Sequence, residues 1–220
     1  MQEITYPVRI VYTKTGRARY ISHLDTMRTL TRALRRSGLP FWYTQGFNPH
    51  LYLTFPLPLA LGVESHYEIV DLRLTEQLEW ATVLETVNTH LPPGFEAKSA
   101  TAPVLPAMAI AWAEYQLEFC IDCERQKSAI QAIKELFGRV EVSVRKKTKK
   151  GEQDIDIRPH MALLKLEEGE SLDCRLRLAA GTSLNVTPKL VLDALALELT
   201  PGNVRTLRTA VLDEKLQYFK

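Results

Sequence analysis

The sequence predicts an α+β protein built from two tandem ferredoxin-like (split βαβ) domains, with antiparallel sheets and helices on one face. Within the first hundred residues, periodicity gives the order strand, helix, strand, strand, helix, strand, which is the order of that motif. The same order recurs later without a visible sequence repeat. Between the two halves, residues 101–110 are uncharged and rich in alanine and proline, as is typical of a linker. We therefore expect domains at 1–103 and 111–220.

The first half carries clear helix and strand signals. Residues 7–13 alternate as a strand does. Ser22, with Asp25 three residues later, indicates a capping box, and the helix should close at Ser37-Gly38 before Pro40. Its predicted core face consists of Leu24, Met27, Leu30 and Leu34. The remaining elements are predicted as strands at 41–44, 51–55, 67–74 and 95–101 and a helix at 76–90.

The second half repeats these signals. Cys120 and Cys123 lie on either side of Asp122, which we interpret as a helix N-cap. Cys120 then ends a strand and Cys123 begins a helix. The two cysteines are not interpreted as half of a zinc site, since no second pair of ligands has zinc-site spacing. Thr187 should open the last helix. The predicted elements are strands at 115–121, 172–179 and 204–212, helices at 122–137 and 188–199, and a long hairpin that pairs 140–146 with 155–166.

Composition bounds the function. The 220 residues are 45% hydrophobic and carry a net charge of +2, so nucleic-acid affinity must come from local clusters of charge. No apolar run is long enough to span a bilayer, the first residues lack a signal peptide, and the three cysteines are odd in number. We expect a cytoplasmic protein without a membrane partner. No metal site, iron–sulfur motif or phosphate loop is recognisable, so no cofactor is predicted.

The start of the first helix is a candidate anion site. Free backbone N–H groups and the helix dipole attract phosphate there, with Ser22 in the first turn and Arg17 and Arg19 just upstream. His23 and Asp25 are candidates for an acid–base pair, although residues two apart on a helix do not face each other. The alternative is a capping box with an exposed histidine.

A cationic face and a loop follow. Arg28, Arg32, Arg35 and Arg36 lie about 130° around the helix from its apolar face. The loop Gln45-Gly46-Phe47-Asn48-Pro49-His50 combines turn residues with groups able to contact a nucleotide, and Trp42, Tyr43 and Tyr52 flank it. Its predicted nucleotide-contacting residues are Gln45, Phe47, Asn48 and His50. The alternative is an ordinary turn with its aromatic side chains in the core.

A lysine-rich segment is the third candidate. Lys146, Lys147, Lys149 and Lys150 should lie at a hairpin tip, where they would contact phosphates in a salt-dependent manner. A solvated loop is the equal alternative. Arg158, fixed by the following Pro159, adds one more candidate cation.

These motifs resemble a known family. The segments 19–25, 32–40, 45–50 and 58–65, with 156–159 as a weaker echo, are similar to the signature of the radical-SAM-linked proteins, a bacterial domain of unknown function. In that family the domain occurs alone or fused behind a radical SAM enzyme, often encoded near ribonuclease E/G genes. The resemblance implies a radical SAM enzyme acting in trans and an RNA setting, and it transfers no catalytic residue. Thr44 stands where serine is common.

Three functions fit the sequence. The first is an RNA-binding accessory module for a radical SAM enzyme in RNA modification or processing, with the arginines and lysines on phosphates. The second is a metal-free RNA-processing enzyme that uses His23, Asp25 or His50 as acid–base groups. The third is a protein-interaction or small-ligand module whose basic face is incidental. The enzyme function requires that five side chains converge in one pocket, namely those of Ser22, His23, Asp25, Asn48 and His50.

Overall fold

The computed structural model describes residues 4–148, 151–181, 184–200 and 202–220. This part of the chain is α+β, with four α-helices and antiparallel strand pairs. It forms two compact units, one comprising Met1–Ile110 with Tyr218–Lys220 and the other Ala111–Gln217. No helix in the described ranges has the length and apolar character needed to cross a membrane.

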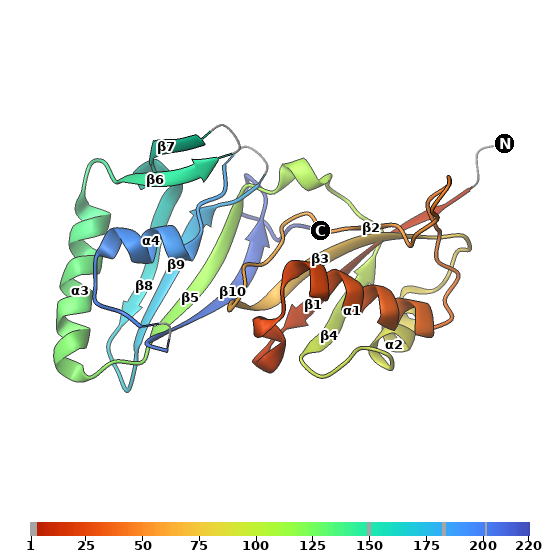
Figure 1. Cartoon of the computed structure of the whole chain (residues 1–220), viewed down its shortest axis with the longest axis horizontal. Helices are drawn as coiled ribbons and strands as arrows, with labels where there is room; N and C mark the ends of the chain where they lie inside the picture. Colours follow the sequence, from red (N-terminus) through yellow and green to blue (C-terminus); the bar gives the residue numbers. More distant parts are fainter. Residues whose placement is uncertain (1–3, 149–150, 182–183, 201) are drawn as a thin grey trace. The chain divides into compact units, whose positions relative to one another are not determined.

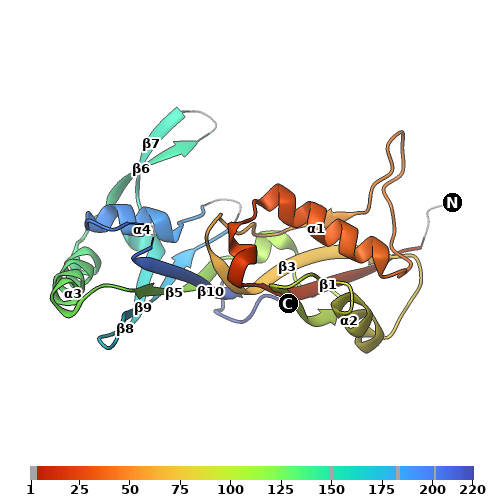
Figure 2. The ribbon, with the colours of Figure 1, turned by 60° about the horizontal axis from the view of Figure 1, so that its bottom comes forward.

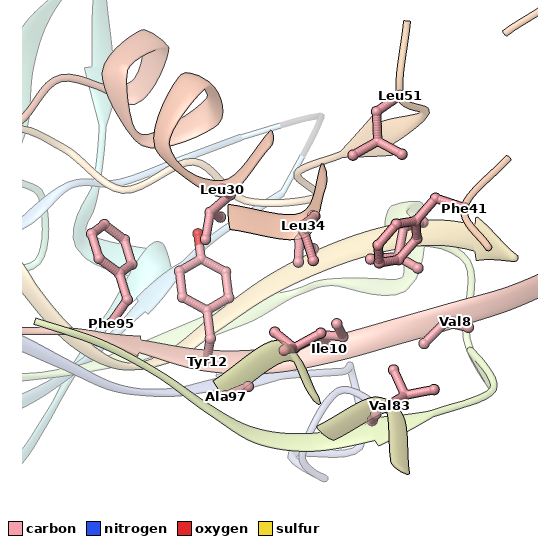
Figure 3. Close-up of a cluster of buried hydrophobic side chains, with 14 of the residues drawn as sticks. Val8, Ile10, Tyr12, Leu30, Leu34, Phe41, Leu51, Val83, Phe95 and Ala97 are labelled. Carbon is pink, nitrogen blue, oxygen red and sulfur yellow. The ribbon is translucent and has the colours of Figure 1, made fainter. Parts of the chain in front are cut away.

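Unit 1 has one sheet with the strand order β4-β1-β3, and β2 pairs with β3 (Figure 1). Its elements are β1 (Tyr6–Lys14), α1 (His23–Arg36), β2 (Leu53–Thr54), β3 (Glu64–Leu74), α2 (Trp80–Asn88) and β4 (Phe95–Thr101). The even-numbered side chains Val8, Ile10 and Tyr12 of β1 join Leu30 and Leu34 of α1 in the core (Figure 3). Val83 and Val87 of α2 belong to the same cluster.

The predicted first helix is confirmed at both ends. Ser22 caps it, and Ser37 is the C-cap before Gly38, which has a φ of +69°. Its predicted core face is wrong at Leu24, which is 62% exposed, whereas Thr26 is buried. The buried stripe runs through Thr26, Leu30, Ala33 and Leu34, because this 3.6-residue spacing places all four toward the sheet.

Other boundaries in unit 1 differ from the expectation. Segments 41–44 and 51–55 are mostly irregular, with single bridges from Phe41 to Leu74 and from Tyr43 to Leu51. The helix predicted from residue 76 begins at Trp80. Residues 101–110, predicted as a linker, contact unit 1, since the Leu105 carbonyl accepts a hydrogen bond from Arg9 Nη1 at 3.0 Å.

Unit 2 has a sheet in the order β10-β5-β9-β8 and a separate two-stranded ribbon, β6-β7 (Figure 1). Its elements are β5 (Trp112–Phe119), α3 (Cys123–Gly138), β6 (Ser143–Thr148), β7 (Gly151–Asp156), β8 (Met161–Glu167), β9 (Leu172–Ala179), α4 (Pro188–Leu195) and β10 (Val204–Leu212). Asp122 caps α3 by accepting from the Arg125 N–H at 2.9 Å, as expected for a cap between two cysteines.

The predicted long hairpin of unit 2 is confirmed only where residues 143–144 pair with 155–156, and its continuation to residue 166 is wrong. β6 pairs with β7, whereas β8 pairs with β9. A short 3₁₀ turn, Arg158–His160, separates β7 from β8. Pro159 lacks an N–H and has a fixed φ, so a continuous strand through 155–166 is disfavoured. The last helix also ends early, at Leu195, because Ala196 adopts a left-handed conformation with a φ of +51°.

Candidate nucleic-acid interface

The carboxylate of Asp25 offsets the partial positive charge at the N-terminal end of α1. Ser22 Oγ accepts from the Asp25 N–H at 3.1 Å and donates to Asp25 Oδ2 at 2.7 Å. Arg28 Nη1 lies 3.1 Å from Asp25 Oδ1. The Ser22 hydroxyl, followed by the Arg28 guanidinium, lowers the pKa of Asp25. The carboxylate therefore occupies the positive helix end where a phosphate was expected.

His23 faces away from Asp25. Its ring packs edge-on against Phe55, with centroids 5.3 Å apart. Burial, followed by the charge of Lys14, lowers the pKa of His23, which favours the neutral imidazole. No hydrogen bond or ion pair within the described ranges joins His23 to Asp25, as expected for residues two apart on a helix.

Beneath His23 lies a small polar cavity that sequence reasoning missed. Its volume is about 10 Å³, close to that needed for one water molecule. The Lys14 ammonium at its wall donates to the Ile21 carbonyl at 3.0 Å. Lys14, Glu68 and Thr26 are all buried. The lining residues are Tyr12, Lys14, His23, Thr26, Phe55, Pro58, Leu59 and Glu68. The strand register, which pairs Tyr12 with Glu68, places this acid on the core face.

We expect His23 to make stability depend on pH. Its pKa in the folded protein lies below its value in the unfolded chain, which is about 6.5. The unfolded chain therefore binds more protons as the pH falls through 6.5, and the free energy of unfolding decreases between pH 7 and 5. Urea unfolding at several pH values should show a shallower decrease for His23→Gln than for wild type.

The control for this pH dependence is His66→Gln, because the His66 side chain is exposed. It should keep the wild-type slope. Equal slopes in wild type, His23→Gln and His66→Gln would contradict the assignment to His23.

The two upstream arginines have different environments. Arg17 is exposed. Arg19 Nη2 donates to the Tyr20 hydroxyl at 2.6 Å, and its Nη1 lies 3.4 Å from Glu64. The hydrogen bond to Tyr20 is the main cause that raises the pKa of Arg19. The Arg19 carbonyl also accepts from the Gly62 N–H at 2.8 Å. Arg19 therefore holds the 58–65 turn, and Arg17 is the more accessible cation.

The predicted cationic face of α1 is exposed to solvent. Arg28, Arg32 and Arg36 follow at steps of four residues and form one stripe, with Arg35 beside it. We call these four residues the α1 arginine stripe. Asp25 is the one acidic residue in this helix sequence. Like charges four residues apart destabilise a helix by about 0.2–0.5 kcal/mol per pair, so the stripe lowers the stability of α1.

The C-terminal part of the stripe contacts other parts of unit 1. The Arg35 guanidinium lies over the Tyr43 ring, 5.6 Å from its centroid. Arg36 Nη2 donates to the His90 carbonyl at 3.0 Å. These contacts orient the two guanidinium groups, which remain exposed.

The 45–50 loop projects from a short two-stranded arm, residues 41–52. The Thr44 N–H donates to the His50 carbonyl at 2.8 Å, and the His50 N–H donates to Thr44 Oγ1 at 3.1 Å. His50 Nδ1 lies 3.0 Å from the same hydroxyl. Gly46 has a φ of +126°, which favours glycine, and the Phe47 side chain is fully exposed. A defined turn therefore presents an aromatic ring to solvent, with Gln45, Asn48 and His50 also exposed.

Arg73 joins the flanking aromatic residues. Its guanidinium lies 5.5 Å from the Trp42 ring centroid and 4.7 Å from that of Tyr52. The two rings pack edge-on, 5.7 Å apart. Trp42, Tyr52 and Arg73 are partly exposed and do not belong to the main core cluster. Sequence reasoning missed Arg73 because it pairs with the arm only after β3 folds against it.

The predicted catalytic candidates do not converge. The arm follows the C-terminal end of α1, and Figure 2 shows this orange segment rising above that end of the helix. Ser22, His23 and Asp25 lie at the opposite end of a 14-residue helix, which is about 20 Å long. His50 contacts Thr44 and the Asn48 carbonyl. The arrangement separates His23 from His50 and offers no shared acid–base site.

Arg158 has a structural position. Its guanidinium donates to the backbone carbonyls of Phe137 (2.8 Å), Arg139 (3.1 Å) and Met161 (3.3 Å). Asp156 Oδ1 accepts from the N–H groups of Val142 and Arg158 at 2.8 and 2.9 Å. These hydrogen bonds join the end of α3 to the base of the β6-β7 ribbon, so Arg158 has a structural role, and its contact with phosphate stays a prediction.

The lysine-rich segment is described only in part. In the ribbon ladder, Lys146 pairs with Gln153 and Lys147 with Glu152. Lys149 and Lys150 lie outside the described residues. Cys120 and Cys123 are exposed, and burial raises the pKa of the Cys174 thiol to about 12. Across the described ranges, no group of three or more His, Cys, Asp or Glu side chains could hold a metal ion.

Comparisons with known proteins identify a family but no function. The family model described as "Uncharacterized protein conserved in bacteria (DUF2344)" matches residues 8–188. No curated protein matches the sequence. A solved chain from a Cbf5-Nop10-Gar1 complex is similar at 16% identity with a TM-score of 0.46 over 93% of this chain, which spans 48% of that chain. An unknown protein from Galdieria sulphuraria is similar at 14% identity with a TM-score of 0.29, covering 92% of this chain and 96% of its own. Likeness at this level carries no functional information.

Proposed function

We propose that this chain, which belongs to the bacterial family of uncharacterized DUF2344 proteins, binds RNA through the α1 arginine stripe and the 45–50 loop. The observation that carries the proposal is the stripe itself. Arg28, Arg32 and Arg36 are exposed on one line of a helix whose acidic residue lies in the first turn. Two four-residue steps cover about 12 Å of helix axis, enough to contact successive backbone phosphates.

The energetic cost of the stripe supports a polyanionic ligand. Like charges at these spacings destabilise α1 when it is unbound, and a phosphate backbone would remove that repulsion. Arginine also forms bidentate hydrogen bonds with phosphate, which lysine cannot match. The exposed Phe47 ring adds a surface on which an unpaired base would stack, and this favours RNA with unpaired segments over a regular duplex.

The strand orders support a finer description of the fold. In unit 1 the order β4-β1-β3-β2 follows from the described pairings, and in unit 2 it is β10-β5-β9-β8. Each is the order of a split βαβ fold, with the β6-β7 ribbon inserted in unit 2. We infer that both units are ferredoxin-like.

Arg32→Ala/Arg36→Ala tests the proposal. The double variant should bind single-stranded RNA at least tenfold more weakly than wild type, because two phosphate contacts are lost. The magnitude of the slope of log K against log salt should fall by about 1.4 to 1.8, since each of the two lost phosphate contacts contributes about 0.7 to 0.9. Filter binding or fluorescence anisotropy at several salt concentrations measures both quantities.

The matched control is Lys98→Ala/Lys165→Ala, which removes the same charge from exposed positions on β4 and β8. It should leave affinity and slope close to wild type. If both double variants weaken binding equally, net charge rather than the stripe is responsible, and the proposal fails.

The partner proposed from the family resemblance is a radical SAM enzyme supplied in trans. In that arrangement this chain would hold an RNA for modification or processing by the partner. Co-purification of the two proteins, before and after nuclease treatment, tests it. Retention that needs RNA fits the accessory module, retention after nuclease favours the protein-interaction alternative, and no retention removes the partnership. The acid–base alternative has no support from geometry, since His23 lies at the N-terminal end of α1 and His50 lies in the arm that follows its C-terminal end.

A further inference from the structure

The arm has two different sides. Tyr43 bridges to Leu51, the Tyr52 N–H donates to the Trp42 carbonyl at 3.3 Å, and Thr44 pairs with His50. Side chains alternate along paired strands, so Tyr43 and Leu51 share one side, and the other side carries Trp42, Thr44, His50 and Tyr52. Tyr43 contacts Arg35 of α1 and Leu51 enters the core. His50 therefore lies with Trp42 and Tyr52, on the side away from α1.

Arg73 belongs to this second side. The Trp42 N–H donates to the Arg73 carbonyl at 2.8 Å, which fixes the arm against the end of β3. On β3, Arg73 alternates with Leu72 and Leu74, which are buried under the helices, so its side chain projects from the opposite face of the sheet. The described partners of its guanidinium are the Trp42 and Tyr52 rings rather than a carboxylate.

This composition is suited to one kind of ligand. A guanidinium beside two aromatic rings keeps its positive charge and its N–H donors, and it adds a planar surface of its own. Nucleobases stack on aromatic rings and guanidinium planes, and their phosphates bind the cation. An acidic peptide would use the charge but not the three flat surfaces.

We propose that Trp42, Tyr52 and Arg73 form a stacking site for one unpaired nucleotide of the bound RNA, with His50 beside it as a hydrogen-bonding group. This inference rests on the proposed RNA-binding function and adds a site on the face opposite the α1 arginine stripe. The stripe holds backbone phosphates, whereas the second site selects an unpaired base. A regular duplex, whose bases are stacked and paired, cannot occupy it.

The fluorescence of Trp42 tests this site directly. The chain with Trp80→Phe and Trp112→Phe retains Trp42 as its single tryptophan. Titration with a single-stranded oligoribonucleotide should quench its emission, because the base stacks on the indole, and a duplex of the same sequence should quench it far less. Circular dichroism checks that the substituted chain is folded.

Arg73→Lys separates stacking from charge. This variant keeps the positive charge and loses the planar guanidinium, so affinity for the single strand should fall by roughly 5- to 160-fold, the range for loss of one stacked base. The salt slope should stay unchanged, in contrast to Arg32→Ala/Arg36→Ala. Tyr52→Phe, which preserves the ring, should bind like wild type, and Tyr52→Leu should resemble Arg73→Lys.

The outcomes distinguish the two proposals. Binding that depends on Arg32 and Arg36 but neither quenches Trp42 nor changes in Arg73→Lys would overturn the stacking site and leave the proposed function intact. Equal quenching by single strand and duplex would also overturn it. Absence of RNA binding by the wild-type chain would overturn both.

Discussion

Asp71→Ala should lower the free energy of unfolding of unit 1 by about 3–5 kcal/mol. Arg9 and Asp71 are opposed in the β1–β3 register, with Nε and Nη2 of Arg9 each 2.7 Å from a carboxylate oxygen. Arg9 is 2% exposed, and the Phe219 ring covers its guanidinium at 4.3 Å. Removing the carboxylate leaves a buried cation with one remaining described acceptor, the Leu105 carbonyl. An uncompensated buried charge is the reason for the large effect.

Urea unfolding followed by tryptophan fluorescence in a Trp112→Phe background measures this loss, because Trp42 and Trp80 then report on unit 1. The matched control is Glu96→Ala, which removes the exposed ion pair with Lys98 and should change stability by less than about 1 kcal/mol. Arg9→Met/Asp71→Leu should recover part of the loss, since it leaves no buried charge. Equal effects of Asp71→Ala and Glu96→Ala would contradict the assignment.

Phe219→Ala should destabilise unit 1 by about 3–5 kcal/mol, the usual cost of truncating a buried phenylalanine. The side chain is 0% exposed although Phe219 is the second-to-last residue of the sequence. Backbone contacts fix it, since the Tyr67 hydroxyl donates to the Phe219 carbonyl at 3.0 Å, and the Val104 and Leu105 N–H groups donate to the Lys220 carbonyl at 3.2 and 2.9 Å. Truncation removes the ring and also exposes Arg9 to water.

Two comparisons make this prediction specific. Tyr218→Ala, at an exposed residue that contacts Tyr67, should cost no more than about 1.5 kcal/mol. A double-mutant cycle of Phe219→Ala with Arg9→Met should show a coupling energy above about 0.5 kcal/mol, because the two side chains are in contact. If Phe219→Ala and Tyr218→Ala had the same free energy of unfolding, the ring of Phe219 would not cover Arg9. Additive effects in the double-mutant cycle would show the same.

The sequence predicted those features that depend on neighbours along the chain. Ser22 and Gly38 mark the ends of α1 because capping uses backbone groups within one turn. The arginines at four-residue steps had to share a helix face once the helix was placed. Asp122 was assigned correctly as a cap for the same reason.

Periodicity was insufficient where the apolar pattern allowed two choices. Leu24 fits the predicted core stripe, yet Thr26 is buried in its place, because the contact of α1 with the sheet decides which of two neighbouring stripes is covered. The hairpin that was predicted through 155–166 failed at Arg158-Pro159. Strand partners depend on long-range pairing, so the separate β6-β7 ribbon could not be read from local alternation.

The sequence by itself thus determined the α+β class, the capped helix and its line of exposed arginines, since each follows from interactions over a few residues. Only the tertiary structure decided which polar residues share a site. It buried Lys14 and Glu68 beside His23, engaged Arg158 with backbone carbonyls and placed Arg73 between Trp42 and Tyr52. These contacts join residues far apart in sequence, and strand register and packing, which no local pattern encodes, bring them together.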